Sequence, residues 1–151
     1  MQTINSLDAL KVLKGKEIGK SDWLEITQER INDFAQATGD YQWIHVDAER
    51  CKSESPFGKP IAHGYLTLSL IPVLFEQILE VKNIRMAVNY GLNKTRFLAP
   101  VKVNSRIRLK LEMAQCEEVK RGLRVVNTCT VEIEGQEKPA CIAESIVLYY
   151  A

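Results

Sequence analysis

The second half of the chain alternates between apolar and polar residues. From 106 to 113, and again from 123 to 133, almost every second residue is apolar and most residues between are polar or charged. This period of two predicts β-strands with one covered face. Glycine-containing turns at 120–122 and 135–139 follow or separate these runs. Further strands are expected at 84–98 and 141–150, and one near 23–26.

Helix signals dominate the first half of the chain. Ser6 as an N-cap and Gly15 as a stop predict a short helix over residues 6–14. Thr27 resembles the N-cap of a second helix. Gly39 should end that helix, because glycine readily takes the left-handed conformation at a helix C-terminus. The residues directly after Gly39 should therefore lie on a loop.

The most apolar segment runs from Ile61 to Val81. Its pattern predicts a long helix that begins near His63-Gly64 and is buried on most sides, with Leu66, Leu70, Val73, Leu74, Gln77 and Ile78 on its main face. Pro72 should bend this helix, because proline lacks an N–H group and clashes with the preceding turn. The glutamates in the segment argue against a membrane span, since charges near a bilayer centre cost several kcal/mol.

The order of these elements predicts an α+β fold. Residues 46–61 look irregular, apart from one short turn that Asp47 can cap, because Pro56, Gly58 and Pro60 resist regular structure. The chain has no repeat or linker, and 151 residues fit one domain, residues 1–151, with one core. We therefore expect an antiparallel sheet wrapped around one long helix.

Composition and charge narrow the class of protein. Lys and Arg number 20 against 19 Asp and Glu, so no bulk attraction to nucleic acid or membranes is expected. The N-terminus lacks the basic start and apolar run of a signal peptide. The four cysteines form no C-x-x-C pair and no metal-ligand spacing with histidine. A reducing cytoplasm is the simplest setting, although the sequence leaves disulfides open.

Two histidines are present, and one of them follows an aspartate closely. His45 comes five residues after Asp40. On a bent loop, a carboxylate and an imidazole at this separation can hold one water between them. Such a pair can remove a proton from water and return one to a product. A capping aspartate and an ordinary loop histidine would give the same letters, so this spacing alone is weak evidence.

His63-Gly64 stands where the long helix should begin. Backbone N–H groups at a helix start lack partners and can bind an anion or a developing oxyanion. Gly64 would let a substrate approach the main chain closely. Taken alone, His63 is more simply a hydrogen-bonded structural residue. Tyr41, Trp43 and Tyr65 are open to two interpretations, as the lining of an acyl pocket or as core. Asn93, Lys94 and Arg96 could contact a phosphate-bearing ligand, whereas Arg106, Arg108 and Lys110 are more simply a solvated strand face.

Three segments in this order resemble the MaoC-like dehydratase family, in particular its branch with nodulation protein N and the (R)-specific enoyl-CoA hydratases. They are FAQATGDYQWIHVD at 34–47, SPFGKPIAHGYLTLSL at 55–70 and NKTRFLAPV at 93–101. The resemblance implies a hot-dog fold, in which a curved antiparallel sheet wraps a central helix, and a homodimer. One departure is Gln42-Trp43, where the better-known family motif has Asn-Pro.

The resemblance also implies a reaction, the reversible hydration of a trans-2-enoyl-CoA to a (3R)-3-hydroxyacyl-CoA. The family's catalytic pair falls on Asp40 and His45, and its oxyanion donor falls on the N–H of Gly64. Further substrate contacts are expected at Gln42, Ala62, His63 and Asn93. No metal or other cofactor is expected, since CoA, or an acyl carrier protein, arrives as part of the substrate.

Two other functions remain open on the sequence. The hot-dog fold also hosts acyl-CoA thioesterases, and fold alone does not decide function. Thioesterases of this fold usually place their carboxylate elsewhere than in a G-D-x-x-x-x-H loop. The third possibility is a non-catalytic module that binds acyl thioesters, against which the presence of both Asp40 and His45 argues.

Overall fold

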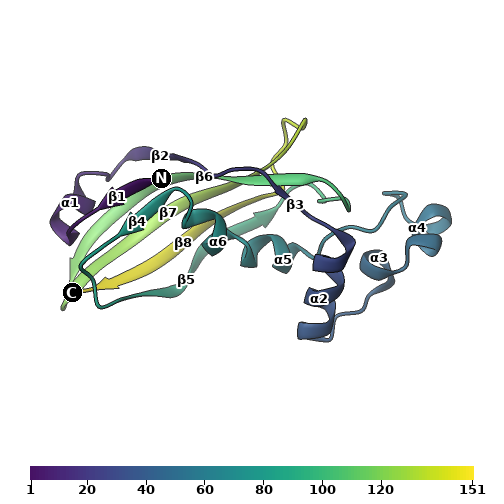
Figure 1. Cartoon of the computed structure of the whole chain (residues 1–151), viewed down its shortest axis with the longest axis horizontal. Helices are drawn as coiled ribbons and strands as arrows, with labels where there is room; N and C mark the ends of the chain where they lie inside the picture. Colours follow the sequence, from purple (N-terminus) through teal and green to yellow (C-terminus); the bar gives the residue numbers. More distant parts are fainter.

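A six-stranded antiparallel sheet forms the body of the molecule (Figure 1). The computed structural model describes residues 1–151. The strand order is β2-β6-β7-β8-β5. The short strand β3 also pairs directly with β6. The strands predicted in the second half are confirmed, as is the short one near 23–26. The bounds are β2 (Lys16–Lys20), β3 (Leu24–Glu25), β5 (Met86–Phe97), β6 (Arg106–Val119), β7 (Gly122–Ile133) and β8 (Cys141–Tyr150).

The two predicted N-terminal helices are confirmed, with their N-caps, but the first ends at Lys11 rather than at the predicted stop, Gly15. In α1 (Leu7–Lys11), the Ser6 hydroxyl accepts the N–H of the third helical residue at 3.1 Å. In α2 (Gln28–Thr38), Thr27 caps the first turn in the same way. Gly39 ends α2 in the left-handed conformation, with φ at 78°. The helix stop therefore delivers Asp40 to a loop, as the sequence predicted.

The single long helix predicted from His63 is wrong in length. Two short helices take its place, α5 (Gly64–Ser69) and α6 (Ile71–Phe75). Pro72 lies in the first turn of α6, where its missing N–H costs nothing, so the proline separates the two helices rather than bending one. The chain then turns and forms β4 (Leu79–Val81), which pairs in parallel with β1 (Gln2–Ile4). Neither three-residue strand is long enough to show a period of its own.

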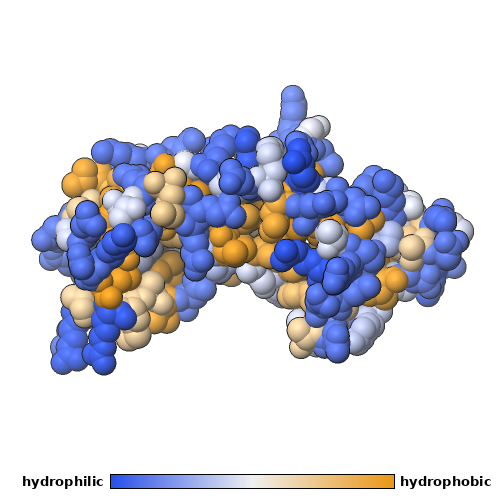
Figure 2. Space-filling view, in the orientation of Figure 1, coloured by the Kyte–Doolittle hydropathy of each residue, from blue (hydrophilic) through white to orange (hydrophobic).

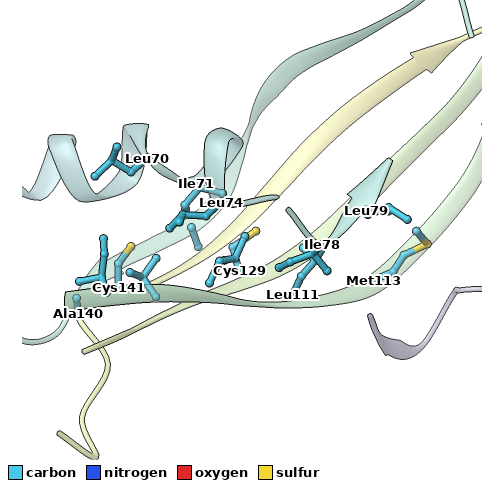
Figure 3. Packing of buried hydrophobic residues seen from close by; sticks show 14 of the residues in the cluster. Leu70, Ile71, Leu74, Ile78, Leu79, Leu111, Met113, Cys129, Ala140 and Cys141 are labelled. Atoms are coloured by element: carbon cyan, nitrogen blue, oxygen red, sulfur yellow. The ribbon is translucent and has the colours of Figure 1, made fainter. Parts of the chain in front are cut away.

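The two short helices pack against one face of the sheet (Figure 3). Leu70, Ile71 and Leu74 lie over the inward residues of the strands, where Cys129 and Cys141 act as small hydrophobes. All four cysteines are free thiols. Val73, expected in this core, is instead 48% exposed, because the break before α6 turns it outward.

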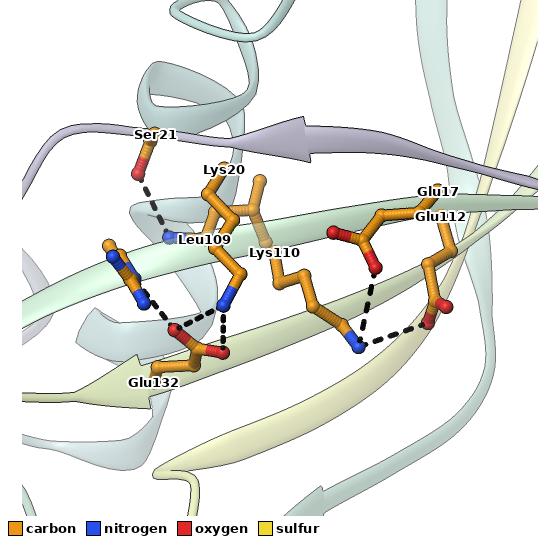
Figure 4. A network of polar contacts seen from close by, with 8 residues as sticks. Glu17, Lys20, Ser21, Leu109, Lys110, Glu112 and Glu132 are labelled. Atoms are coloured by element: carbon orange, nitrogen blue, oxygen red, sulfur yellow. Dashed lines mark hydrogen bonds and ion pairs between the residues drawn. The ribbon is translucent and has the colours of Figure 1, made fainter.

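The opposite face of the sheet carries paired charges (Figure 4). Glu132 of β7 binds both Lys20 at 3.0 Å and Arg108 at 2.6 Å, and Lys110 lies between Glu17 and Glu112. The predicted solvated strand face is therefore confirmed. Each such pair contributes little to stability, because water screens it.

A helical lobe extends beyond one end of the sheet, formed by α2 with α3 (Trp43–Val46) and α4 (Ala48–Glu54) (Figure 1). The prediction that residues 46–61 are irregular is wrong over α4. Asp47 accepts the N–H of Arg50 at 3.0 Å, as the sequence predicted, but the helix continues beyond the expected single turn to Glu54. No helix of the chain is long and apolar enough to cross a membrane.

Candidate active site

Three residues meet where the helical lobe joins α5. Asp40 follows α2, His45 lies in α3, and His63 directly precedes α5. One carboxylate oxygen of Asp40 and one ring nitrogen of each histidine all lie within 4.8 Å of one another. A single water can bridge groups at such a separation, since two hydrogen bonds of about 2.8 Å span it. The sequence proposed the Asp40–His45 pair and expected His63 as a substrate contact, and the structure places all three in one cluster.

His45 is held as a neutral base. Its side chain is buried, and its Nδ1–H donates to the carbonyl oxygen of Ile61 at 2.7 Å, because a carbonyl can only accept. The pKa of His45 lies below its usual value, mainly because burial disfavours the charged ring. The positive charge that His63 can carry lowers this pKa further, whereas the hydrogen bond to the Ile61 carbonyl and the nearby Asp40 carboxylate raise it. The proton on Nδ1 leaves the lone pair of Nε2 free to accept a hydrogen bond.

Hydrogen bonds hold the loop at Asp40 in place, while the Asp40 carboxylate remains accessible to solvent. The carboxylate is 53% exposed, and its Oδ1 accepts the N–H of Gln42 at 3.2 Å. The Asp40 carbonyl accepts the Nε2–H of His63 at 3.0 Å. These bonds fix the loop on both sides of the carboxylate.

Gly64 begins α5 beside this cluster. The N–H groups of Leu66 and Thr67 donate to the His63 carbonyl, so the N–H of Gly64 precedes the helical ladder and has no acceptor within it. A Cβ added at Gly64 would lie 3.1 Å from the ring of Phe97. A side chain at this position would press on the Phe97 ring, which would have to shift by a few tenths of an ångström.

The same three side chains do not suit a metal ion. His45 Nδ1 and His63 Nε2 are both committed to carbonyl oxygens. The two rings are stacked, with centroids 3.8 Å apart and planes 23° from parallel. In-plane lone pairs of stacked rings run nearly side by side and cannot converge on one ion, so we assign no metal to this cluster.

Not all of the other predicted substrate contacts belong to this cluster. Gln42 contacts the cluster through its main-chain N–H, which donates to the Asp40 carboxylate. Ala62 is buried, and its N–H donates to the Val101 carbonyl at 2.8 Å. Asn93 is exposed on β5, within a register shift, and makes no hydrogen bond to the cluster. Among the aromatics, Tyr41 and Tyr65 are exposed, and Trp43 is half-buried under the Arg50 guanidinium.

Apolar space adjoins the cluster. A cavity of about 250 Å³ reaches Gly64 and is lined mostly by apolar residues, including Phe57, Ile61 and Phe97. A second groove, of about 540 Å³, lies farther along the sheet between α6, β4, β5 and β8. In Figure 2, apolar side chains gather over the centre of the visible face, where Figure 1 places α5 and α6.

Comparison with known proteins defines the class. A family model described as the MaoC-like domain matches residues 11–136. The chain is 51% identical to the 3-hydroxyacyl-thioester dehydratase Z of Mycobacterium tuberculosis (strain ATCC 25618 / H37Rv), with both chains fully covered. It is 44% identical to nodulation protein N of Rhizobium leguminosarum bv. viciae, over 89% of this chain and 84% of that one. The solved (R)-hydratase from A. caviae, involved in PHA biosynthesis, has a TM-score of 0.72 at 25% identity, covering 87% and 95% of the two chains.

The fold and these relatives define a hot-dog enzyme of the hydroxyacyl-thioester dehydratase/hydratase class. The chain belongs to the MaoC-like dehydratase family.

Proposed function

We propose that the protein is an (R)-specific enoyl-CoA hydratase, which interconverts a trans-2-enoyl-CoA and a (3R)-3-hydroxyacyl-CoA. The observation that carries the proposal is that an oxygen of the Asp40 carboxylate lies within 4.8 Å of a ring nitrogen of His45, a span that one shared water can bridge. Nδ1 of His45 is bound to the Ile61 carbonyl, which leaves Nε2 as the nitrogen that can accept from that water. The (R) outcome rests on the (R)-hydratase among the structural neighbours.

The chemistry follows from this pairing. The shared water donates one hydrogen bond to Nε2 of His45 and the other to Asp40. Asp40 removes a proton as the water oxygen bonds to C3 of the enoyl group, and the electron pair moves to the thioester oxygen. The N–H of Gly64 stabilises that oxygen as its charge develops. The protonated Asp40 then returns a proton to C2, and dehydration runs the same steps in reverse.

Crotonyl-CoA tests this function directly. The purified protein should remove the enoyl absorbance and form 3-hydroxybutyryl-CoA of the (3R) configuration on a chiral analysis. Saturated butyryl-CoA should release no free thiol, because the water is placed to attack C3 rather than the thioester carbonyl. Thiol release without hydration would favour the thioesterase, and binding without turnover would favour the non-catalytic module. A comparison of the hydration rates of crotonyl-CoA and of the crotonyl thioester of acyl carrier protein, in separate assays, shows which carrier the enzyme prefers.

The homodimer is part of the same proposal, and the edge strand β5 supports it. One edge of β5 pairs with β8, and the other has no partner strand. Met86, Val88, Tyr90 and Leu92 are all more than a third exposed along this strand. An unpaired edge with exposed apolar residues is a template for pairing with a second strand, here that of a second copy.

We expect Tyr90→Lys to weaken this dimer. A charge placed at a packed interface must lose its water, and the loss of an aromatic anchor costs about 2 kcal/mol, roughly a thirtyfold rise in Kd. Light scattering after size-exclusion chromatography should show a dimer for the wild type and a concentration-dependent monomer for the variant. Val12→Lys, at a residue 64% exposed beside α1, is the matched control and should stay dimeric. A monomeric wild type would rule the homodimer out.

A further inference from the structure

His63 contacts both members of the proposed catalytic pair. Its side chain is only 3% exposed and lies between Phe34 of α2 and His45, with ring centroids 4.9 Å and 3.8 Å away. Its Nε2–H donates to the Asp40 carbonyl at 3.0 Å. One side chain therefore supports the ring of the candidate histidine and the main chain of the candidate aspartate.

The free-energy cost of burying the polar ring of His63 indicates that this residue does more than fill space. Its Nδ1 is buried and has no hydrogen-bond partner. A buried polar atom without a partner is unfavourable, and an apolar side chain of similar size would avoid that cost. Although His63 occupies the N-cap position of α5, its side chain caps no helical N–H. The two contacts to Asp40 and His45 are the interactions that only a histidine supplies here.

We propose that His63 is a positioning residue of the active site, whose ring holds the imidazole of His45 in place while its Nε2–H fixes the Asp40 main chain. The inference rests on the proposed hydratase function. His63 does not exchange a proton with the substrate; it keeps the carboxylate and Nε2 of His45 at the separation that one water can bridge. Reacting groups must be held this closely, because a displacement of about 1 Å can cost about 100-fold in rate.

The stacked rings also affect when His45 is neutral. Two imidazolium charges 3.8 Å apart would repel, so a charge on one ring disfavours a charge on the other. The titratable groups near His45 are Asp40 on the preceding loop, His63 before α5, and the Cys51 thiol of α4, which lies against the carbonyls of α3. From α2, the groups that face this region, Phe34 and Gln28, are uncharged. Without His63, the pKa of His45 should therefore rise, since a cause that lowers it is lost.

Two variants separate the contacts of His63. His63→Phe keeps a ring that can stack and removes the donor, whereas His63→Gln keeps an N–H donor and removes the ring. Both remove the neighbouring charge, so the NMR titration midpoint of His45 should rise in both. The acid limb of kcat/KM for crotonyl-CoA should move to higher pH with it, because His45 must be neutral to accept the water's hydrogen. In His63→Phe, kcat should fall about 10- to 100-fold with KM nearly unchanged, and His63→Gln should retain more activity.

Cys51→Ala is the control, because it removes a buried side chain whose thiol lies against the main-chain carbonyls of α3. It should lower Tm and leave the midpoint of His45 unmoved. Wild-type kcat in both His63 variants, or an unmoved midpoint in both, would overturn the proposal, since a residue that holds neither Asp40 nor His45 would behave in that way. If His63→Phe does not fold, His63→Gln decides alone. If the wild type does not hydrate crotonyl-CoA, the proposed function fails, while the His45 titration still tests the positioning role.

Discussion

Asp40→Asn is expected to lower kcat for hydration of crotonyl-CoA by about 100- to 10,000-fold, the range that general acid–base catalysis contributes. The amide has the shape of the carboxylate and can still accept the N–H of Gln42, so the loop should keep its conformation. It cannot, however, take a proton from water. The side chain is half exposed, and its removal leaves no buried group without a partner. The KM should change by no more than a few fold, measured from the loss of enoyl absorbance.

The control for this variant lies on the helix just before the loop. Asp33→Asn removes the same charge from an exposed position of α2 and should leave kcat at the wild-type value. His45→Gln should lose activity to a similar degree as Asp40→Asn, because an amide can donate to the Ile61 carbonyl but offers no basic nitrogen. Full activity in Asp40→Asn would remove Asp40 from the mechanism and with it the assignment of the water site.

The second large effect is expected at Gly64, where one backbone N–H is proposed to stabilise the developing oxyanion. Gly64→Pro removes that N–H at the first residue of α5, a position that proline suits. His63 already has φ at −58° and ψ at 138°, which the residue before a proline readily adopts. The loss of one oxyanion donor typically costs about 100- to 1000-fold in kcat.

Gly64→Ala is the matched comparison, because it adds a Cβ and keeps the N–H. Both variants crowd the ring of Phe97, so both should lose some stability in thermal unfolding. The ratio of their kcat values then reports the N–H alone. Equal activity in the alanine and proline variants would show that the thioester oxygen is stabilised elsewhere.

Local signals in the sequence determined much of the fold. Thr27 and Gly39 bracket α2 through bonds within one turn, and the alternation along β6 and β7 follows from one buried face, so both could be predicted without knowledge of the rest. The same local logic placed Asp40 on a loop, directly after a helix stop. The proposal that this loop is catalytic came from the resemblance of three segments to a family, since the spacing of Asp40 and His45 alone is uninformative.

Only the tertiary structure decided the features that depend on distant partners. The strand β4 forms because β1, far away in the sequence, offers it a parallel edge. His45 takes its tautomer from the Ile61 carbonyl, and His63 reaches across from α5 to stack on it. Helix caps and strand periods act over a few residues, whereas these contacts join residues 16 to 77 positions apart in the sequence. The sequence by itself therefore determined where the proposed pair, Asp40 and His45, stands on the chain, and the stacking of His63 on His45 decided how that pair is held.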